Sequence, residues 1–392
     1  MVEFTQYLED QQKSLVTPCY IFSKKIIFQQ ILKLKELLPD GIELLYSLKA
    51  NSNIEILRCI EPHVDGFDVS SRGELEKLLR RVSTSKYLSY VGVGKTLFDI
   101  TFALERFNNL VVVVESIEEF VEVSTWAKEL GNRIKILLRL QLSEVYLASG
   151  RKLNNRFSQF GIHQNEVMAH FGNLMDNPNI ELLGFHYHPG SNFLDPQLII
   201  SNLNILFNFV ELIRQRFGYR PEQLNLGGGF GIPYFSGQSP FDLFQFGEAL
   251  KGELSTRSED IFGSAKLIFE LGRFVLGPAG CFVSRVLRTK VVNQKKIVVM
   301  DGGFSQNLAL VGFDQIIKKS APLKVWARST GDLERVSLVG PSCYSADVWA
   351  EDIYLPKLDV GDLIYVPNSG AYGKAFSPTS FLCGVVPEEV LI

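Results

Sequence analysis

The stretch LLYSLKAN, residues 44–51, places a charged amine at the end of an apolar run. Such a short apolar run, bounded by polar residues, predicts a strand that is buried in the core. Lys49 alone would be explained by a stem that lies along apolar surface while its head reaches water. The rest of the chain decides between that explanation and a functional one.

Seven further runs of this kind follow, and the segments between them have helical patterns. SRGELEKLLRRV (71–82) and SIEEFVEVSTWAKELG (116–131) both begin with Ser and carry Glu early, as helix N-termini do. Eight strands that alternate with helices predict an α/β fold, a parallel (β/α)8 TIM-type barrel. The eight runs cover residues 42–48, 66–70, 87–92, 110–116, 134–140, 182–188, 223–229 and 266–271.

After residue 275 the pattern changes. Stretches such as CFVSRVLRTKVV (281–292) and DIYLPKLDVGDLIYV (352–366) are strand-like, with turn residues between them and little helical periodicity. We therefore expect a barrel domain at 18–275, followed by a mostly β second domain at 276–392. The alternative is one large α/β domain with an irregular end.

Composition excludes several classes of partner. The chain has 392 residues, 46% of them hydrophobic and 21% charged, with a net charge of −3, so neither nucleic acid nor an anionic membrane is expected as a partner. No stretch approaches transmembrane length. The five scattered cysteines fit no disulfide framework or zinc knuckle, and residues 1–14 have no signal-peptide pattern. We expect a cytoplasmic protein.

In a (β/α)8 barrel the carboxyl ends of the strands converge on the face that holds the active site. Unrelated solvent-directed side chains would not gather at equivalent positions, so Lys49 is interpreted as the centre of a site. The residues at these ends are Lys49, Asp68, Lys95, Arg139, His188, Gly227, Gly228, Gly229, Glu270 and Arg273.

LNLGGGFGIPY (224–234) follows the seventh run. Consecutive glycines let a backbone approach a phosphate closely, although such a stretch is more often a simple turn. The dinucleotide fingerprint is not met, because Ile232 stands where its third glycine would be. The position after strand seven, with Arg273 after strand eight, is where barrels hold phosphates.

GFHYHPGSN (184–192) puts His186 and His188 on one side of a strand. A metal pair is one interpretation, but no cysteine or acid cluster completes it, and no metal is expected. His186 is predicted to be a packed core histidine. His188, at the strand end, is predicted to stack on an aromatic ligand, with Ser191 donating to its phosphate.

FELGRF (269–274) offers Glu270 and Arg273, which would form an ion pair in the simplest interpretation. Functionally, the carboxylate would keep a ring nitrogen protonated and the arginine would bind a phosphate. An amine, a phosphate cradle, a stacking histidine and this carboxylate together describe a site for pyridoxal 5'-phosphate. Lys49 would form an imine with its aldehyde.

These motifs, in this order, resemble the fold III pyridoxal-phosphate decarboxylases, the ornithine, arginine and diaminopimelate decarboxylase family, from about Pro18 to Gly384. The matching stretches are YSLKAN (46–51), FDVSSRGELE (67–76), HYHPGS (186–191), LNLGGGFG (224–231), ELGR (270–273), GPSCYSADVWAED (340–352) and NSGAYG (368–373). The cofactor contacts expected across these motifs are Lys49, Asp68, Arg139, His188, Ser191, Gly227, Gly228, Gly229, Glu270, Gly272, Arg273 and Tyr372.

The resemblance also implies an obligate homodimer with shared active sites, in which residues 1–17 join the second domain. Cys343 would face the cofactor of the partner subunit and, together with Lys49, form the catalytic pair, returning a proton after carbon dioxide leaves. Asp347 would help to fix the cysteine loop, and Tyr344 and Asp347 would contact the substrate.

Three positions depart from the family pattern: Leu271 replaces a proline, Gln159 a lysine, and Tyr344 the acid that usually holds the distal amine of the substrate. We therefore expect decarboxylation of an amino acid or amino-acid conjugate, free or carrier-bound, in siderophore, peptide or other specialised biosynthesis. If Asp347 or Glu351 holds the amine instead, free diaminopimelate, ornithine or lysine would be the substrate. An amino-acid racemase and a regulatory homologue without cofactor are further alternatives.

Overall fold

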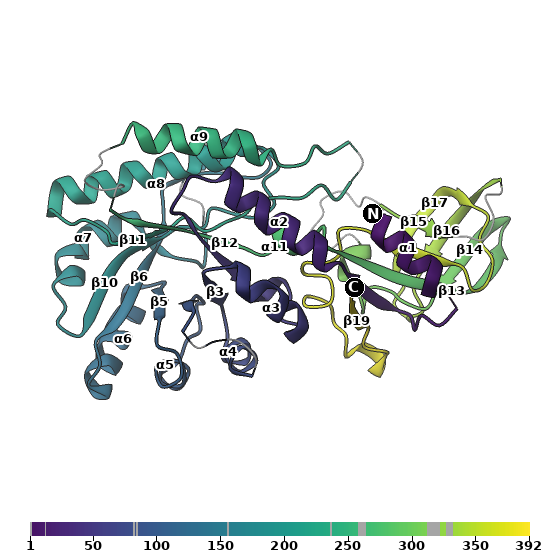
Figure 1. Ribbon diagram of the computed structural model, residues 1–392, viewed down its shortest axis with the longest axis horizontal. Coiled ribbons are helices and arrows are strands. Elements are labelled where there is room, and N and C mark those ends of the chain that lie inside the picture. The colour runs from purple at the N-terminus through teal and green to yellow at the C-terminus, as the bar shows by residue number, and fades with distance from the viewer. Residues whose placement is uncertain are drawn as a thin grey trace. The chain divides into compact units, whose positions relative to one another are not determined.

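The computed structural model describes residues 2–11, 13–80, 83, 85–154, 157–235, 237–257, 264–311, 322–326 and 332–392. The chain forms two compact units that interleave along the sequence (Figure 1). One unit comprises Met1–Gln30, Ile232–Ser239 and Arg273–Ile392, and the other comprises Ile31–Gly231 and Pro240–Gly272. The domain boundaries expected from the sequence stay a prediction.

The second of these units contains a closed barrel of eight parallel strands. Neighbouring strands pair in parallel in the order β10-β11-β12-β2-β3-β4-β5-β6. A parallel pairing between β10 and β6 closes the ring. Each strand overlaps one of the eight predicted runs, so the predicted barrel is confirmed. The strands are β2 (Glu43–Ser47), β3 (Gly66–Val69), β4 (Tyr87–Tyr90), β5 (Leu110–Val114), β6 (Ile134–Gln141), β10 (Ile180–His186), β11 (Gln223–Asn225) and β12 (Lys266–Leu271).

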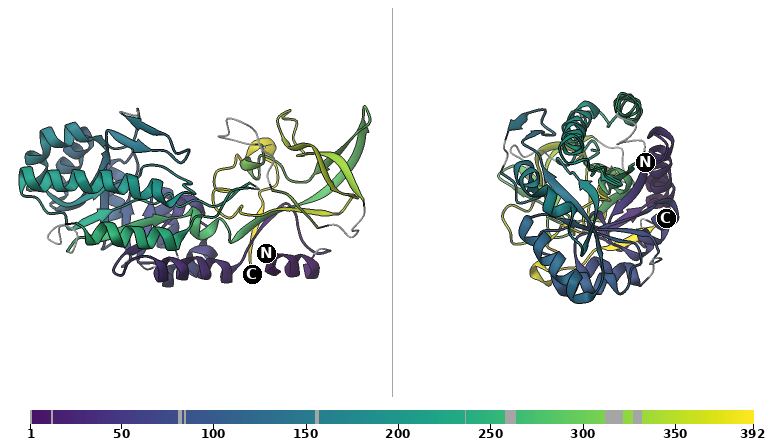
Figure 2. Two further views of the ribbon diagram at one scale, coloured as in Figure 1. Left: turned by 90° about the horizontal axis from the view of Figure 1, so that it is seen from above. Right: turned by 90° about the vertical axis from the view of Figure 1, so that its left-hand side faces the viewer.

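Helices surround these strands, as the right-hand view of Figure 2 shows. They are α3 (Ile54–Ile60), α4 (Arg72–Leu79), α5 (Leu97–Leu104), α6 (Ile117–Leu130), α7 (Gln164–Met175), α8 (Pro196–Phe217) and α9 (Leu243–Ser255), and α2 (Lys24–Leu37) runs through both units. Short elements complete the unit: η1 (Leu48–Ala50), η2 (Glu61–His63), β7 (Glu144–Tyr146), β8 (Lys152–Asn154) and β9 (Ile162–His163).

Three helices that follow barrel strands, α4, α5 and α6, each begin at a hydroxyl side chain that caps the helix. Ser71, Thr96 and Ser116 accept hydrogen bonds from the backbone N–H three residues on, which satisfies a donor that the helix leaves unpaired. These caps fix where the chain turns away from the strand ends. A buried apolar cluster within the barrel joins Leu45, Tyr87, Val91, Val111, Val113, Leu137, Leu183 and Ile268, and the same strands also carry a few buried polar residues.

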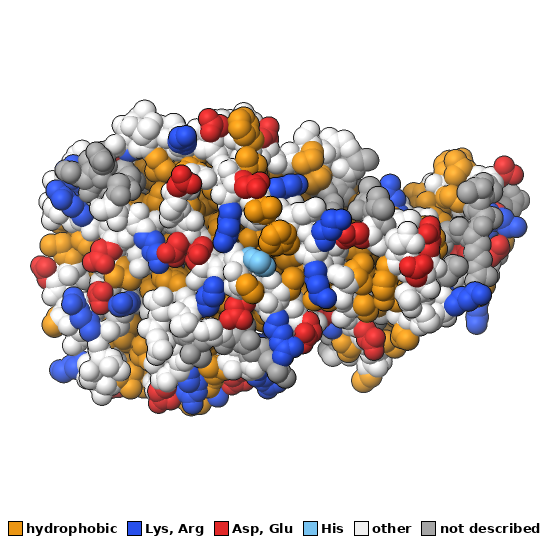
Figure 3. Space-filling view, in the orientation of Figure 1, with side chains coloured by type: hydrophobic (Ala, Val, Ile, Leu, Met, Phe, Trp, Pro, Cys, Tyr) orange, Lys and Arg blue, Asp and Glu red, His pale blue; other side chains and the backbone are white. Residues whose placement is uncertain are grey.

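Helix α8 has the length and hydropathy of a membrane span. The expectation that no stretch of the chain approaches transmembrane length is therefore wrong. However, 56% of its apolar stretch is buried inside the fold. The core helix of a soluble barrel has the same composition, so α8 is weak evidence for a membrane segment. Positive and negative side chains are interspersed on the face drawn in Figure 3.

The other unit is mostly β, as predicted. Its sheet has the order β15-β18-β13-β14-β16-β17, and β1 pairs with β13 and with β19. Phe4 and Leu8 of α1 pack into a core cluster with Cys19, Cys281 and Leu363. The elements are α1 (Val2–Gln11), β1 (Cys19–Phe22), α11 (Arg273–Leu276), β13 (Gly280–Val292), β14 (Lys295–Met300), η3 (Leu308–Val311), β15 (Lys324–Trp326), β16 (Leu333–Val339), β17 (Val348–Pro356), β18 (Leu363–Val366), η4 (Phe381–Cys383) and β19 (Glu388–Leu391).

Candidate active site

A cavity of about 690 Å³ opens at the carboxyl ends of the barrel strands. Five residues predicted from the sequence line it: Lys49, Lys95, Arg139, His188 and Ser191. Its size is that of a site for a small molecule or cofactor.

Lys49 lies in the short turn η1, directly after β2. Its Nζ is 3.0 Å from Oδ2 of Asp68 at the end of β3, and the lysine side chain is 43% exposed while that of Asp68 is fully buried. Burial and the neighbouring charge of Glu270 raise the pKa of Asp68, and Lys49 opposes this rise. Gly272 packs against the turn, since a Cβ there would lie 2.7 Å from Cβ of Ala50. The amine is therefore held by a buried carboxylate and still reaches the cavity.

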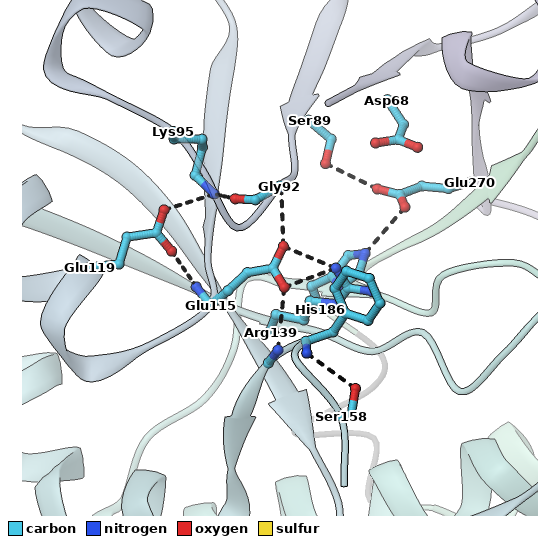
Figure 4. Close-up of polar contacts among 12 residues, drawn as sticks. Asp68, Ser89, Gly92, Lys95, Glu115, Glu119, Arg139, Ser158, His186 and Glu270 are labelled. Atoms are coloured by element: carbon cyan, nitrogen blue, oxygen red, sulfur yellow. Dashed lines mark hydrogen bonds and ion pairs between the residues drawn. The ribbon is translucent and has the colours of Figure 1, made fainter. Parts of the chain in front are cut away.

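Glu270, at the end of β12, is held by side chains from three other strands, and Figure 4 shows two of these side chains, Ser89 and His186. Its Oε1 accepts hydrogen bonds from Ser89 Oγ (3.0 Å) and Asn225 Nδ2 (2.6 Å), and its Oε2 lies 3.2 Å from His186 Nε2. Burial raises the pKa of Glu270, but His186, Lys49 and Asn225 outweigh burial and hold this pKa well below its ordinary value. The barrel thus keeps a fixed negative charge.

The two histidines of the predicted motif have different surroundings. Burial lowers the pKa of His188 to about 3, and the charges of Lys49 and Arg139 add to this effect, so the ring is neutral at physiological pH. His188 Nδ1 has no hydrogen-bond partner among the described residues. His186 is buried, as predicted, but its contact with Glu270 was not foreseen.

The glycine stretch packs closely on the end of β12. Gly227 and Gly229 have φ of 66° and 91°, and a Cβ on Gly228 would lie 2.0 Å from the backbone oxygen of Glu270. Gly227 N donates to Asn225 Oδ1 (3.0 Å), and Glu270 N donates to Gly227 O (2.6 Å). Only glycine allows this approach of the two backbones.

Arg139, at the end of β6, is already paired. Its Nη1 lies 3.0 Å from both carboxylate oxygens of Glu115, which also accept hydrogen bonds from Gly92 N (3.1 Å) and Gly161 N (3.3 Å). Lys95 Nζ lies 2.8 Å from Oε1 of Glu119 (Figure 4). Two cations beside the cavity are therefore balanced by two carboxylates.

Arg273 and Tyr372 belong to the other unit and lie together there. The guanidinium carbon of Arg273 is 4.7 Å from the centre of the Tyr372 ring, and its Nη1 donates to Tyr234 Oη (2.5 Å). Tyr372 has a positive φ of 61°, a backbone conformation that is uncommon for residues other than glycine.

The loop around Cys343 exposes its thiol and the ring of Tyr344. The Tyr344 ring packs on Phe304, with ring centres 5.0 Å apart. Asp347 is buried, and its carboxylate accepts hydrogen bonds from Phe304 N (2.9 Å) and Ser342 Oγ (2.8 Å). Asp347 therefore fixes the loop that presents Cys343.

Sequence reasoning missed Ser89, Asn225, Glu115 and Glu119. Glu115 stands at the end of a strand run and Asn225 two residues before the first of the glycines, and these positions were the available signals. Their partners lie on other strands, so sequence spacing does not reveal the contacts. Among the described residues, no group of three or more His, Cys, Asp or Glu is arranged for a metal ion.

The fold and this arrangement of side chains define a pyridoxal-phosphate-dependent decarboxylase of the fold III class. The chain belongs to this family, since residues 24–277 match the model for the pyridoxal binding domain of pyridoxal-dependent decarboxylases. It is a carboxy-lyase that acts on amino-acid substrates with pyridoxal phosphate as its cofactor.

Several curated relatives align over most of both chains. An L-glutamyl-[BtrI acyl-carrier protein] decarboxylase of Niallia circulans is 27% identical over 383 residues, 97% of this chain and 89% of the relative. A 2-[(L-alanin-3-ylcarbamoyl)methyl]-2-hydroxybutanedioate decarboxylase of Staphylococcus aureus is 29% identical and covers 91% and 89%. The crystal structure of Helicobacter pylori diaminopimelate decarboxylase complexed with L-lysine is 26% identical, with a TM-score of 0.85 and coverage of 98% and 93%.

The residues described here fit the cofactor of this family. The barrel offers an amine, an ionised buried carboxylate, a neutral imidazole with a nitrogen that lacks a partner, and a glycine backbone with no room for side chains. These are the groups that an aldehyde, a protonated ring nitrogen, an aromatic face and a phosphate require.

Proposed function

We propose that this decarboxylase acts on an amino acid whose distal group is neutral, acylated or conjugated. The observation that carries this proposal is Tyr344, which follows Cys343 where the resemblance leads us to expect an acid. Its ring is packed on Phe304 and half exposed. Tyr344 offers a hydroxyl and an apolar face, and neither neutralises an ammonium group.

A free distal amine needs a carboxylate when it leaves water, because an unpaired buried charge costs several kcal/mol. Asp347 does not supply one, since it is buried and its oxygens already accept hydrogen bonds, Oδ1 from Phe304 N and Oδ2 from Ser342. A cation–π contact with Tyr344 would recover only about 0.5–2 kcal/mol. Acylation removes the charge and with it this cost.

Two relatives support a conjugated substrate by their names. One is named for an L-glutamyl group on an acyl-carrier protein, and the other for an L-alanin-3-ylcarbamoyl conjugate of a hydroxybutanedioate. We assign this chain the same class of substrate, free or carrier-bound, in the biosynthesis of a siderophore, peptide or other specialised metabolite.

Bound pyridoxal phosphate supplies a sink for the electron pair that is left when the bond between Cα and the carboxylate breaks. Lys49 Nζ would hold the aldehyde carbon of the cofactor, with Asp68 fixing the amine. Neutral His188 would support the ring face without adding charge, and Glu270 would hold a proton on the ring nitrogen. The backbone of Gly227–Gly229, together with Ser191, would bind the phosphate, and the phosphate contact expected of Arg273 from the sequence stays a prediction.

Proton return is assigned to Cys343. By resemblance, its Sγ delivers a proton to the substrate carbon in the site of the partner subunit, and Asp347 keeps its loop in place. This assignment requires a homodimer with shared sites. We further propose a cytoplasmic location, in line with the residue composition.

The test compares kcat/KM for carbon dioxide release from ornithine, lysine and diaminopropionate with that for their distally acylated forms. We expect the acylated forms to be preferred at least about tenfold, from the cost of an unpaired amine. Tyr344→Glu should move the preference toward the free amines, and Tyr344→Phe, the matched control, should not. A free diamino acid turned over as well as its conjugate would refute the proposal for the substrate.

Free diamino acids are the second candidate. Diaminopimelate decarboxylase of Helicobacter pylori is 28% identical over 368 residues, an identity close to that of the two relatives named for conjugated substrates. Glu351, an exposed acid on β17, would then hold the amine. The racemase alternative has no support among the relatives reported above, which are decarboxylases.

A further inference from the structure

The contact between His186 and Glu270 has no role in the proposed function as described so far. His186 Nε2 lies 3.2 Å from Glu270 Oε2, and the two side chains are 1% and 4% exposed. Buried polar groups in folded proteins are nearly always hydrogen-bonded. A hydrogen bond of His186 is therefore expected, but its acceptor is the carboxylate assigned to the ring nitrogen of the cofactor, which points to a role beyond packing.

The surroundings of His186 indicate which of its nitrogens carries a proton. Nδ1 has no hydrogen-bond partner among the described residues. Nε2 faces a carboxylate, which only accepts hydrogen bonds when ionised. His186 must therefore donate from Nε2, whatever the state of Nδ1.

The two oxygens of Glu270 depend on different donors. Oε1 accepts hydrogen bonds from Ser89 and Asn225. Among the described residues, Oε2 accepts its hydrogen bond from His186. Burial and the nearby carboxyl of Asp68 both favour protonation of Glu270. Of the groups that lower its pKa, His186 has the largest effect and Lys49 comes after it.

We propose that His186 is a positioning residue that donates a hydrogen bond to Glu270 and so keeps the carboxylate ionised for the ring nitrogen of the cofactor. This role rests on the assignment of Glu270 in the proposed function. His186 touches neither substrate nor cofactor and acts through Glu270. It would be the reason why HYHPGS carries two histidines on one strand face.

The experiment uses variants that separate the hydrogen bond from packing. His186→Phe removes the donor and keeps a ring. If the His186→Phe protein does not fold, His186→Leu is used in its place. His186→Gln keeps an amide donor. Tyr87→Phe is the matched control, because it deletes another hydrogen bond between strands of the same barrel, the partly buried one from Tyr87 Oη to Gln223 Oε1 (2.8 Å).

Two readouts are taken without substrate. One is the affinity of the cofactor-free protein for pyridoxal phosphate, and the other is the NMR shift of its ¹⁵N-labelled ring nitrogen. In His186→Phe we expect affinity to fall about 10- to 100-fold, the range for hydrogen bonds to charged groups, and the shift to move toward neutral pyridine. His186→Gln should remain within about threefold of wild type, since it restores the donor, and Tyr87→Phe should leave both readouts unchanged.

Two results would overturn the proposal: wild-type affinity and shift in His186→Phe, or equal losses in His186→Phe and His186→Gln. Glu270→Gln is the reference. If it leaves the nitrogen shift unchanged, the role of Glu270 is wrong and the role of His186 falls with it. The proposal for the substrate is unaffected by any of these results, because no substrate is present.

Discussion

At the scale of single residues, the site is a set of charges held in place by buried partners. Lys49, His188 and Glu270 could be predicted from the sequence, because strand ends of a barrel share one face. Ser89, Asn225 and His186 could not be predicted as the partners of Glu270. Each contact joins strands that are far apart in the sequence. The spacing of residues along the chain therefore does not indicate which side chains meet.

His188 gives the pH dependence of stability a definite sign. Its pKa is about 3 in the folded chain and about 6.5 when unfolded. Between these values the unfolded chain binds one more proton, so stability falls as pH falls. We expect the cofactor-free wild type to lose up to about 1.4 kcal/mol per pH unit more than His188→Gln between pH 6 and pH 4.

Urea unfolding at several pH values measures this difference. Parallel curves of unfolding free energy for the two proteins would show that His188 titrates normally in the folded state. In that case its neutrality, and its assigned place against the cofactor ring, would both be wrong.

At the scale of elements, the barrel strands were readily predicted because each is a short run of mainly apolar and mostly buried residues. The strands β7, β8 and β9 were missed, since they have only two or three residues each and too little sequence for a periodic pattern. The close packing of the glycine loop on β12 was foreseen only as backbone access to a phosphate.

Gly228→Ala tests this packing. The new Cβ would lie 2.0 Å from the backbone oxygen of Glu270, so the loop or β12 must shift. We expect a loss of about 1–3 kcal/mol in unfolding free energy and weaker binding of pyridoxal phosphate.

The matched control is Gly252→Ala, in the exposed face of α9, where a Cβ meets nothing within 4 Å. This change should stabilise the protein by about 0.5–1 kcal/mol. Thermal unfolding and cofactor titration measure both variants. A Gly228→Ala protein that behaves like the control would contradict the described contact.

At the scale of the whole molecule, the sequence predicted an α/β barrel and a mostly β domain, and both are confirmed. It did not indicate that Ile232–Ser239, between β11 and α9, belongs with the mostly β unit. A segment belongs to one unit or the other because of its contacts with residues that are distant in the sequence. Local sequence patterns do not show these contacts.

The predicted shared sites can be tested by mixing inactive subunits. Lys49→Ala and Cys343→Ala should each be inactive alone. In a mixed dimer one site carries both defects and the other carries neither, so exchange should restore part of the activity. Carbon dioxide release after exchange, with mixed dimers verified by mass spectrometry, provides the measurement. No recovery in verified mixed dimers would contradict shared sites.

The central claim is that Lys49 holds the cofactor, and reduction of the holoenzyme with borohydride followed by peptide mapping tests it most directly. The cavity contains a second lysine, Lys95, whose side chain is 1% exposed and paired with Glu119, whereas Lys49 is 43% exposed. We predict that the reduced cofactor is found on the peptide containing Lys49, and that Lys49→Ala is colourless and inactive. Label on Lys95 or another lysine would contradict the account.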